Sequence, residues 1–324
     1  MRKLLALSLA AAACGGTAQT FKDQSRNALP SKDAVAMGSP SGSAVTSNAP
    51  PDQITQNSTA GDHSPFFDLT VGVATVFNGG TAGMLGIVEA VTANDPTSCL
   101  ANSCTWGPGH GPFDYSDFKL VVTQVNDGYD WELSGRDFHA AATADFTVFM
   151  NGHAIPGVQK HHGSGTFTVD FDKAATLPGP HDATGKLVVS AYSNVGPAHL
   201  EAIYTGAKDD KHAGQLNNIL YSYANDTAGG GDLDFAVHNT TSNDNFSVHS
   251  RWKNSGTGRA DVEGTGGGVH VALSECWGAA PFAVAYFTSN ITASFPPFGG
   301  PTTPGNPATL CAYDPSAFST KTAP

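Results

Sequence analysis

Apolar and polar positions alternate in short segments along most of the chain after about residue 116. Each segment spans five to nine residues, and turn sequences such as Asn126-Asp127-Gly128 and Asn151-Gly152 separate neighbouring segments. Asn-Gly and Asp-Gly adopt the positive φ of hairpin turns, and no segment between them is long enough for a crossover helix. The pattern predicts antiparallel strands within 116–290, at Phe118–Val125, Tyr129–Leu133, Phe146–Met150, Phe167–Phe171, Leu187–Tyr192, Leu200–Tyr204, Ile219–Tyr223, Leu233–Val237, Phe246–Trp252, Val269–Leu273 and Phe282–Phe287.

Two apolar segments with helical spacing come before these strands. The first runs from Phe66 to Phe77, and in the second, Met84 to Val91, apolar residues recur at i, i+3, i+4 and i+7. Alternation within the first segment also fits a strand. Asn78-Gly79-Gly80 separates the two segments, so we predict a helical hairpin over 66–93.

An apolar sheet face must be covered, and the apolar hairpin is the available partner. The predicted fold class is therefore mainly β, with one large curved antiparallel sheet or half-barrel meander and an N-terminal helical hairpin packed on its concave face. A two-sheet β-sandwich is the alternative. Residues 291–324 are rich in Pro and Gly and are expected to form a tail over the body. We assign 63–324 to a single β-rich domain.

The segment 15–62 has a different composition, dominated by small polar residues and prolines. Stretches such as Ser39-Pro40-Ser41-Gly42-Ser43 and Ala49-Pro50-Pro51-Asp52 show no hydrophobic periodicity. Such sequences bury too little apolar surface to become ordered. We expect 15–62 to be a disordered linker.

The N-terminus has the features of an export sequence. Arg2 and Lys3 are followed by an apolar stretch from Leu4 to Ala13 that is too short to span a bilayer. The small residues before Cys14 resemble a bacterial lipobox, although Ala11 stands where leucine is usual. We therefore expect a signal peptide over 1–14 and lipidation of Cys14, which would attach the chain to the cell envelope, at the outer membrane. An ordinary cleaved signal beside an unrelated cysteine is the alternative.

Four further cysteines fit an exported protein, because an even number in such a chain favours disulfides. Three pairings of these residues are possible. We favour Cys99–Cys104 and Cys276–Cys311, since each pair closes a self-contained loop. Free buried thiols are the alternative, and the spacing lacks the paired knuckles of structural zinc.

Charge and composition exclude several partners. The formal net charge is −12 over 324 residues, and removal of Arg2 and Lys3 with the signal would make it about −14. Nucleic acids and anionic lipid surfaces require clustered basic residues, so no nucleic-acid partner is expected. The membrane partner would be reached through lipid on Cys14.

The chain lacks the motifs of serine hydrolases, zinc proteases, phosphate loops, Rossmann folds and EF-hands. Four histidines lie close together in sequence, and a hairpin could bring three of them to Asp137: His139, His153, His161 and His162. Adjacent strand residues point to opposite faces, so His161 and His162 would not share one ion on a regular strand. We therefore expect no metal, no cofactor and no assigned catalytic residue.

Paired carboxylates can carry out hydrolysis when held ~5–9.5 Å apart. Asp170 with Asp172, and Asp232 with Asp234, have i, i+2 spacing, but solvated surface carboxylates are the simpler interpretation. Arg251 and Lys253 belong to a polar and aromatic cluster around Trp252. Cations there are expected to pack on an aromatic ring and secure a strand.

Three short stretches carry a resemblance: Asn78-Gly79-Gly80 leading to Trp106-Gly107-Pro108, His249-Ser250-Arg251-Trp252 through Asp261, and Glu275-Cys276-Trp277 with Cys311. Over about 66–315 the chain resembles a set of uncharacterised predicted lipoproteins of myxobacteria. The resemblance implies export and a shared architecture, and it assigns no activity and no site residues.

Three functions follow as hypotheses. The first is a lipid-anchored envelope protein that binds a lipid or apolar ligand between the sheet and the hairpin, near Phe77, Met84 and Ile87. A deep pocket would support it, and a filled core would oppose it. The second is a structural or surface-interaction module without a pocket. The third is an envelope hydrolase that uses carboxylates or histidines such as Asp170 or His161.

Overall fold

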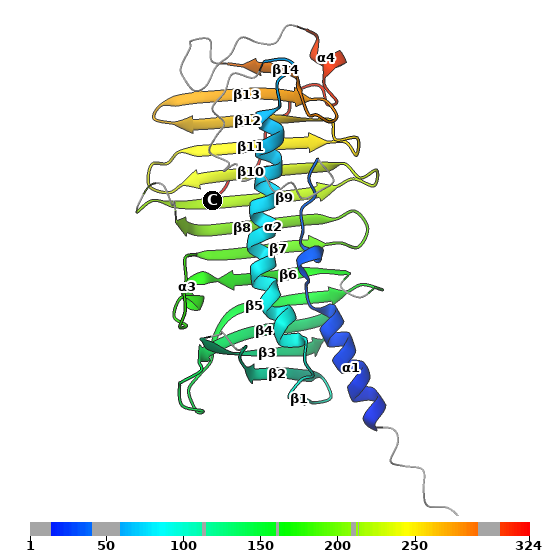
Figure 1. The fold of residues 1–324 in the computed structure, drawn as a ribbon, viewed down its shortest axis with the longest axis vertical. Coiled ribbons are helices and arrows are strands. Elements are labelled where there is room, and N and C mark those ends of the chain that lie inside the picture. The colour runs from blue at the N-terminus through cyan, green and yellow to red at the C-terminus, as the bar shows by residue number, and fades with distance from the viewer. Residues whose placement is uncertain are drawn as a thin grey trace, which may run out of the picture.

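The structure is a computed structural model that describes residues 14–40, 59–111, 115–159, 162–208, 212, 214–290 and 305–324. Within these residues the chain forms one antiparallel sheet of fourteen strands, paired in sequence order from first to last (Figure 1). The sheet is curved and does not close on itself, which confirms the predicted meander and makes the two-sheet sandwich wrong. The strands are β1 Ser98–Cys99, β2 Ser103–Gly109, β3 Ser116–Val125, β4 Gly128–Asp137, β5 Thr147–Pro156, β6 Gly163–Asp170, β7 Lys186–Ser193, β8 His199–Lys208, β9 Leu216–Asn225, β10 Gly231–Asn239, β11 Asn245–Trp252, β12 Gly258–Gly266, β13 Val269–Trp277 and β14 Val284–Ser289.

Alternation along the strands places apolar side chains on one face of the sheet, as period-2 geometry requires. Directly paired positions on successive strands build continuous apolar rows across this face. One such row is Trp106, Leu120, Leu133, Met150, Val169, Leu187 and Tyr204. We call this side of the sheet the inner face and the opposite side the outer face.

One continuous helix, α2 (Pro65–Thr92), lies along the inner face and crosses the strands from β13 to β2 (Figure 1). The predicted hairpin over 66–93 is therefore wrong, because the helix continues through Asn78-Gly79-Gly80. The Asn78 amide binds the main chain of Met37 in both directions, donating to its O and accepting from its N at 2.8 Å each. Gly79 and Gly80 face open space. The glycines lower helix propensity by up to ~1 kcal/mol each, and the burial of flanking residues such as Phe77 and Leu85 offsets that cost.

The start of α2 is fixed by a buried carboxylate on β13. Ser64 caps the helix by accepting a hydrogen bond from the Phe67 N–H at 2.9 Å, and its hydroxyl donates to the Glu275 carboxylate. Glu275 also accepts from the Phe66 N–H at 3.2 Å and is fully buried. A negative group at a helix N-terminus is favoured by the helix dipole, so this arrangement holds α2 to the sheet.

The segment after Cys14 is not a disordered linker over 14–40. Helix α1 (Cys14–Ala28) and the short helix η1 (Lys32–Ala34) precede α2. Phe21, Ala28, Leu29, Val35 and Met37 are buried in the same core as the sheet. These apolar residues are few, but their burial in the core of the sheet holds the segment in place. Residues 41–58 of the predicted linker, and residues 1–13 of the predicted signal, lie outside the described residues.

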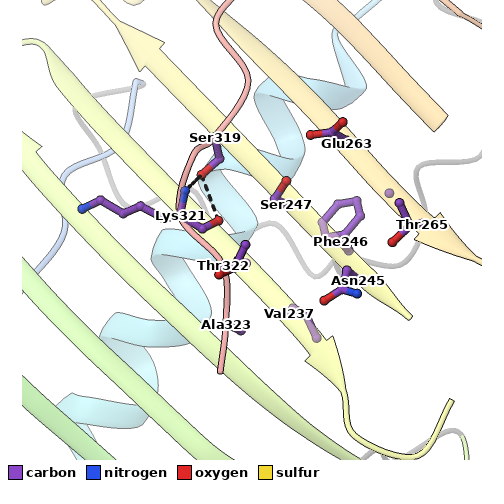
Figure 2. Close-up of a pocket in the computed structure, with 12 residues that line it drawn as sticks. Val237, Asn245, Phe246, Ser247, Glu263, Thr265, Ser319, Lys321, Thr322 and Ala323 are labelled. Carbon is purple, nitrogen blue, oxygen red and sulfur yellow. Dashed lines mark hydrogen bonds between the residues drawn. The ribbon is translucent and has the colours of Figure 1, made fainter. Parts of the chain in front are cut away.

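The segment 305–324 is described as far as Pro324 and includes the short helix α4 (Pro307–Leu310). Its last part, around Ser319 to Ala323, lies on the outer face, opposite α2 (Figure 2), and α4 lies against β14. Strands β1, β2 and β12 were not predicted from the sequence. β12 carries Arg259, Asp261 and Glu263 at alternate positions, and this polar alternation gave no apolar pattern.

Among the described residues, α2 is the one helix whose length and composition would allow it to cross a membrane, with a mean hydropathy of 1.5 in its most apolar window. In this structure it covers the inner face of the sheet, and its Phe66, Leu69, Val73 and Val88 are buried there.

Candidate functional site

An open groove lies between the C-terminal half of α2 and the strands β2 and β3. Its volume is about 590 Å³, which is in the range of small-molecule sites. The helix supplies one wall and the segment around the β2 end supplies the other. The lining residues are Gly83, Gly86, Ile87, Ala90, Val91, Asn94, Asp95, Thr97, Gly107, Pro108, Gly109, His110, Gly111 and Phe118.

The groove exists because α2 has small side chains on this part of its surface. A Cβ added at Gly83 or Gly86 would meet no atom within 4 Å, so both positions open onto free space. Ile87, Val91 and Phe118 are partly buried against the core and present apolar surface to the same space. An apolar chain could lie along this wall.

Charged and polar groups surround the groove. Lys22 of α1 pairs with Asp95 at 2.9 Å, and Arg26 donates to the Asn94 carbonyl at 2.6 Å. The Trp106 indole donates to the same carbonyl at 3.1 Å. Interactions with Lys22, first its hydrogen bond and then its charge, lower the pKa of Asp95.

On the opposite wall His110 lies 2.8 Å from Asp117, which also pairs with Arg136 at 3.3 Å. The hydrogen bond with His110 is the largest influence on Asp117. Together with Arg136 it lowers the pKa of that carboxyl, against the opposing effect of burial. The groove therefore has an apolar wall and an ionised rim.

Elsewhere the helix and the sheet are in direct contact. Phe77 is buried against Tyr221, with ring centroids 4.8 Å apart, and Leu85 is fully buried. Of the three residues expected to line a pocket, only Ile87 borders the groove. Phe77 belongs to the core, and Met84 packs against it.

The outer face carries a row of polar side chains at directly paired positions on six successive strands. The row consists of Glu201, Ser222, Asp234, His249, Asp261 and Ser274. Segment 311–324, here called the strap, crosses this row. His249 contacts the Ala317 O at 2.6 Å, and Asp261 accepts from the Ala317 N–H at 2.9 Å. Farther along, Lys321 binds Glu201 at 2.8 Å and also donates to Ser222.

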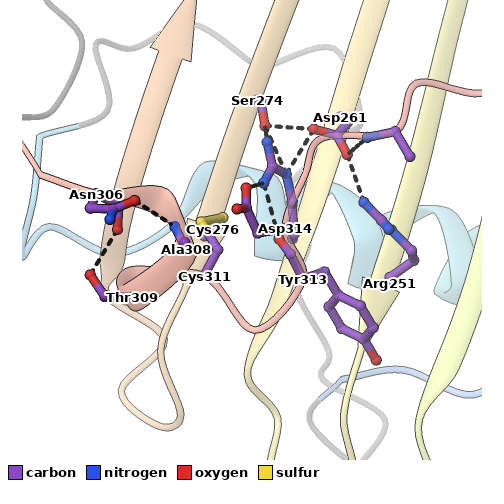
Figure 3. The surroundings of a disulfide bond; sticks show 12 residues. Arg251, Asp261, Ser274, Cys276, Asn306, Ala308, Thr309, Cys311, Tyr313 and Asp314 are labelled. Atoms are coloured by element: carbon purple, nitrogen blue, oxygen red, sulfur yellow. Dashed lines mark hydrogen bonds and ion pairs between the residues drawn. A yellow bond between two sulfur atoms is a disulfide. The ribbon is translucent and has the colours of Figure 1, made fainter.

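Asp261 is the centre of this polar network (Figure 3). It is fully buried and binds Arg251 at 3.1 Å and Arg259 at 3.0 Å. Arg259 also donates to the Tyr313 carbonyl at 3.0 Å. The Arg251 guanidinium lies over the Tyr313 ring at 5.2 Å, and Lys253 at 5.9 Å. The expected cation–π role of Arg251 and Lys253 is confirmed, and the ring they contact belongs to the strap.

A small cavity of about 120 Å³ lies where the strap crosses β10 to β12 (Figure 2). Ser319, Lys321 and Thr322 border it on one side, and Phe246 and Thr265 on the other. The Ser319 hydroxyl donates to the Lys321 carbonyl and accepts from its N–H, which holds the strap in a local turn. The cavity is well below the ~300 Å³ of a typical ligand pocket.

The predicted histidine cluster does not assemble among the described residues. His139 is exposed at the end of β4, beside Asp137 at 3.4 Å. His153 lies on β5 and pairs with Asp130 at 2.8 Å. His161 lies outside the described residues, and His162 follows in the turn before β6. His153 is also 3.7 Å from Asp127, but none of these three described histidines belongs to a group of three metal-binding side chains whose ligand atoms all lie within 4.8 Å of one another.

The first carboxylate pair serves the backbone. Asp170 caps the short helix α3 (Phe171–Ala174) by accepting from the Lys173 N–H at 2.9 Å, and Asp172 accepts from the Gly185 N–H at 2.9 Å. Asp232 and Asp234 do share one strand face, as expected. In addition, His249 of the next strand lies beside them, and this contact was not predicted from the sequence.

The two favoured disulfides are confirmed. Cys99 joins Cys104, and Cys276 joins Cys311, which attaches the strap to β13 (Figure 3). Two disulfides are typical of an exported protein. Cys14 is the first residue of α1, and its side chain is outside the described residues.

Comparison with known proteins found no match: no family model, no curated protein and no solved structure resembles this chain. The resemblance to myxobacterial lipoproteins stays a prediction.

The groove residues Gly83 and Gly86, and the opposite wall formed by residues 107–111, were not predicted from the sequence. The spacing of the glycines in an otherwise apolar segment is visible in the sequence. A groove forms beside these glycines only because of the path of β2, and the sequence pattern did not predict β2 as a strand.

Proposed function

We propose that this chain is an exported envelope protein, anchored by lipid on Cys14, that binds an apolar ligand such as an acyl chain in the α2 groove. The open groove of about 590 Å³, with its glycine, isoleucine and valine wall, is the observation that carries this proposal. The basic and apolar N-terminus before Cys14 and the two disulfides support export.

The position of α1 supports a connection between the anchor and the groove. α1 begins at Cys14 and lies beside the β3 to β5 end of the sheet (Figure 1). Its Lys22 binds Asp95 on the groove rim. Lys22 follows Cys14 by eight positions in the helix, a distance of ~12 Å at 1.5 Å per residue. A lipid on Cys14 would therefore hold the groove end of the molecule near the membrane, where acyl chains are available.

A second candidate is a structural or interaction module without a ligand. The filled interface between α2 and the rest of the sheet favours it, because Phe66, Leu69, Val73, Phe77 and Leu85 are all buried. The hydrolase alternative gains no support from Asp170 and Asp172, since both accept main-chain hydrogen bonds.

Lipid analysis distinguishes the first two candidates. The mature protein is extracted in detergent, and co-purified lipids are identified by mass spectrometry. Gly86→Leu would fill the groove, and Gly79→Leu is a matched control, since both glycines lie in α2 with nothing near an added Cβ and only Gly86 lines the groove. We expect lipid with the wild type and with Gly79→Leu, and its loss with Gly86→Leu. Equal lipid in both variants, or none in the wild type, would favour the structural module.

The anchor is tested separately. The mass of the N-terminal peptide should show lipid on Cys14, and Cys14→Ser should move the protein from the membrane fraction to the soluble fraction. An unmodified Cys14 thiol would refute the anchor and leave the groove proposal standing.

A further inference from the structure

Three metal-binding side chains meet on the outer face, far from the α2 groove in the strand order. Asp232 and Asp234 lie on β10, and His249 is directly opposite Asp234 on β11. One ligand atom from each of the three lies within 4.8 Å of the others. Ligands of one zinc ion lie ~3.3 Å apart, given zinc–ligand distances of ~2.0–2.1 Å in tetrahedral geometry. Small side-chain rotations would bring the three to that spacing.

The His249 ring is held in the orientation that a metal ligand needs. Its Nδ1 lies 2.6 Å from the Ala317 O, and a carbonyl can only accept, so Nδ1 carries a proton. Metal-binding histidines commonly donate their second ring N–H to a carbonyl or carboxylate in this way, which fixes the tautomer. The Nε2 atom therefore points to Asp232, 3.0 Å from its Oδ1.

In a neutral imidazole with this tautomer, Nε2 has a lone pair, and Asp232 Oδ1 is also an acceptor. Two acceptors at 3.0 Å require a cation between them, either a proton on Nε2 or a metal ion. The two carboxylates and the imidazole match the donor set of a divalent transition metal with an open coordination position. Asp232 is about half exposed, so an ion could enter from solvent.

The surrounding charges leave the site accessible to a cation. Arg251 faces Asp232 across the strand pair, but it binds Asp261 at 3.1 Å and packs on Tyr313. Lys321 of the strap is engaged by Glu201 and Ser222. Lys253 lies by the Tyr313 ring. Each of these neighbouring cations has a partner other than the Asp232 and Asp234 carboxylates.

We propose that Asp232, Asp234 and His249 form a binding site for one divalent transition-metal ion, with Zn²⁺ as its best-matched occupant. Because His249 also binds Ala317, the ion would stabilise the docking of the strap on the sheet. The site is independent of the α2 groove and of the lipid anchor.

The test is a Zn²⁺ titration of the untagged full chain by calorimetry, in competition with a chromophoric chelator. We expect one ion per chain, with proton release on binding and a higher melting temperature. His249→Ala and Asp234→Asn should each weaken binding by ~100-fold or more, since loss of outer-shell partners alone costs 10–100-fold. Far-UV circular dichroism verifies that the variants are folded. Asp232→Asn is a further variant, chosen because Asp232 is about half exposed and its substitution should disturb folding little; it should also weaken Zn²⁺ binding.

His153→Ala is the matched control. His153 is also an outer-face histidine, 2.8 Å from Asp130 and 3.7 Å from Asp127, but among the described residues these side chains do not form a group whose ligand atoms all lie within 4.8 Å of one another. It should leave Zn²⁺ binding unchanged. Absence of Zn²⁺ binding by the wild type, or equal binding by folded His249→Ala and His153→Ala, would overturn the proposal.

Discussion

The two faces of the sheet are covered by segments of opposite chemistry. On the inner face, α2 packs through apolar side chains, and the main polar attachment among the described contacts is at its start, where Ser64 and Glu275 meet. On the outer face, the strap packs through directional bonds from Asp261, His249, Arg259 and Lys321. Apolar packing tolerates any well-shaped partner, whereas the outer face requires atoms at particular positions. The position of α2 on the inner face therefore follows from the hydrophobic pattern of the sequence, and the position of the strap on the outer face follows from the register of the strands.

The largest loss of stability is expected from a substitution in α2, which covers the inner face. Phe67 of α2 stacks on Phe282, with ring centroids 3.9 Å apart, and lies edge-on to Trp277. Phe67→Ala should lower the free energy of unfolding by ~3–5 kcal/mol, as for other buried aromatic residues. Urea denaturation measures this loss. The control is Val76→Ala, at an exposed position of the same helix, which should change the free energy of unfolding by less than ~0.5 kcal/mol. Similar values for the two would mean that α2 is not part of the cooperative core.

The disulfide of the strap should have a slightly smaller effect. Cys276–Cys311 spans 35 residues and Cys99–Cys104 spans 5. Chain entropy predicts losses of ~3.8 and ~2 kcal/mol when each pair is changed to serine, because the longer loop restricts the unfolded chain more. Denaturation of the two double variants compares them. Equal losses would show that the strap is held by its polar contacts alone.

The buried carboxylate of the outer face comes next. Asp261→Asn keeps the shape of the side chain but removes the charge that Arg251 and Arg259 bind. We expect a loss of ~2–3 kcal/mol, the size of a lost charged hydrogen bond in a buried network. Asp130→Asn is the control, since Asp130 is 59% exposed and should cost less than ~1 kcal/mol. Limited proteolysis would additionally show whether the strap has been released.

The smallest effect is a pH dependence from His249. Burial lowers its pKa, but hydrogen bonds to Asp232 and Ala317 and the nearby Asp charges outweigh burial, so the pKa is raised above 6.5. A raised pKa stabilises the fold below the unfolded value, and this stabilisation is lost as pH rises through the folded value. A chelator keeps metal ions away from His249. Under these conditions, the difference in free energy of unfolding between the wild type and His249→Gln should decrease between about pH 5.5 and about pH 8.5. A constant difference over this range would show that His249 does not carry a proton there.

The inner face was predictable because apolar residues repeat at the spacing of strands and helices. Leu120, Leu133 and Met150 stand at alternate positions in their segments and become one row. The hairpin prediction was wrong because Asn78-Gly79-Gly80 was interpreted as a turn between two helices. Instead, the Asn78 side chain forms hydrogen bonds with the Met37 main chain, and the helix continues through the glycines.

The outer face was not predictable in the same way. Asp234 and His249 are 15 positions apart in the chain, and only the exact pairing of β10 with β11 places them opposite each other. A shift of one residue would move His249 to the inner face. Both residues are visible in the sequence, but the register of β10 with β11 is not. The order of 14–40 was also missed, because Phe21, Leu29 and Met37 are too widely spaced to stand out among small polar residues.

The length of α2 limits how far the sheet can be extended while its inner face stays covered. A helix of 28 residues is ~42 Å long, whereas eleven strand spacings from β2 to β13 measure ~53 Å along a sheet. The helix reaches both ends because it spans the curved sheet as a chord spans an arc. A lineage that gained one hairpin would add ~9.6 Å of sheet and would need about six more helical residues to keep it covered. In such a fold, the number of strands and the length of the helix are expected to evolve together.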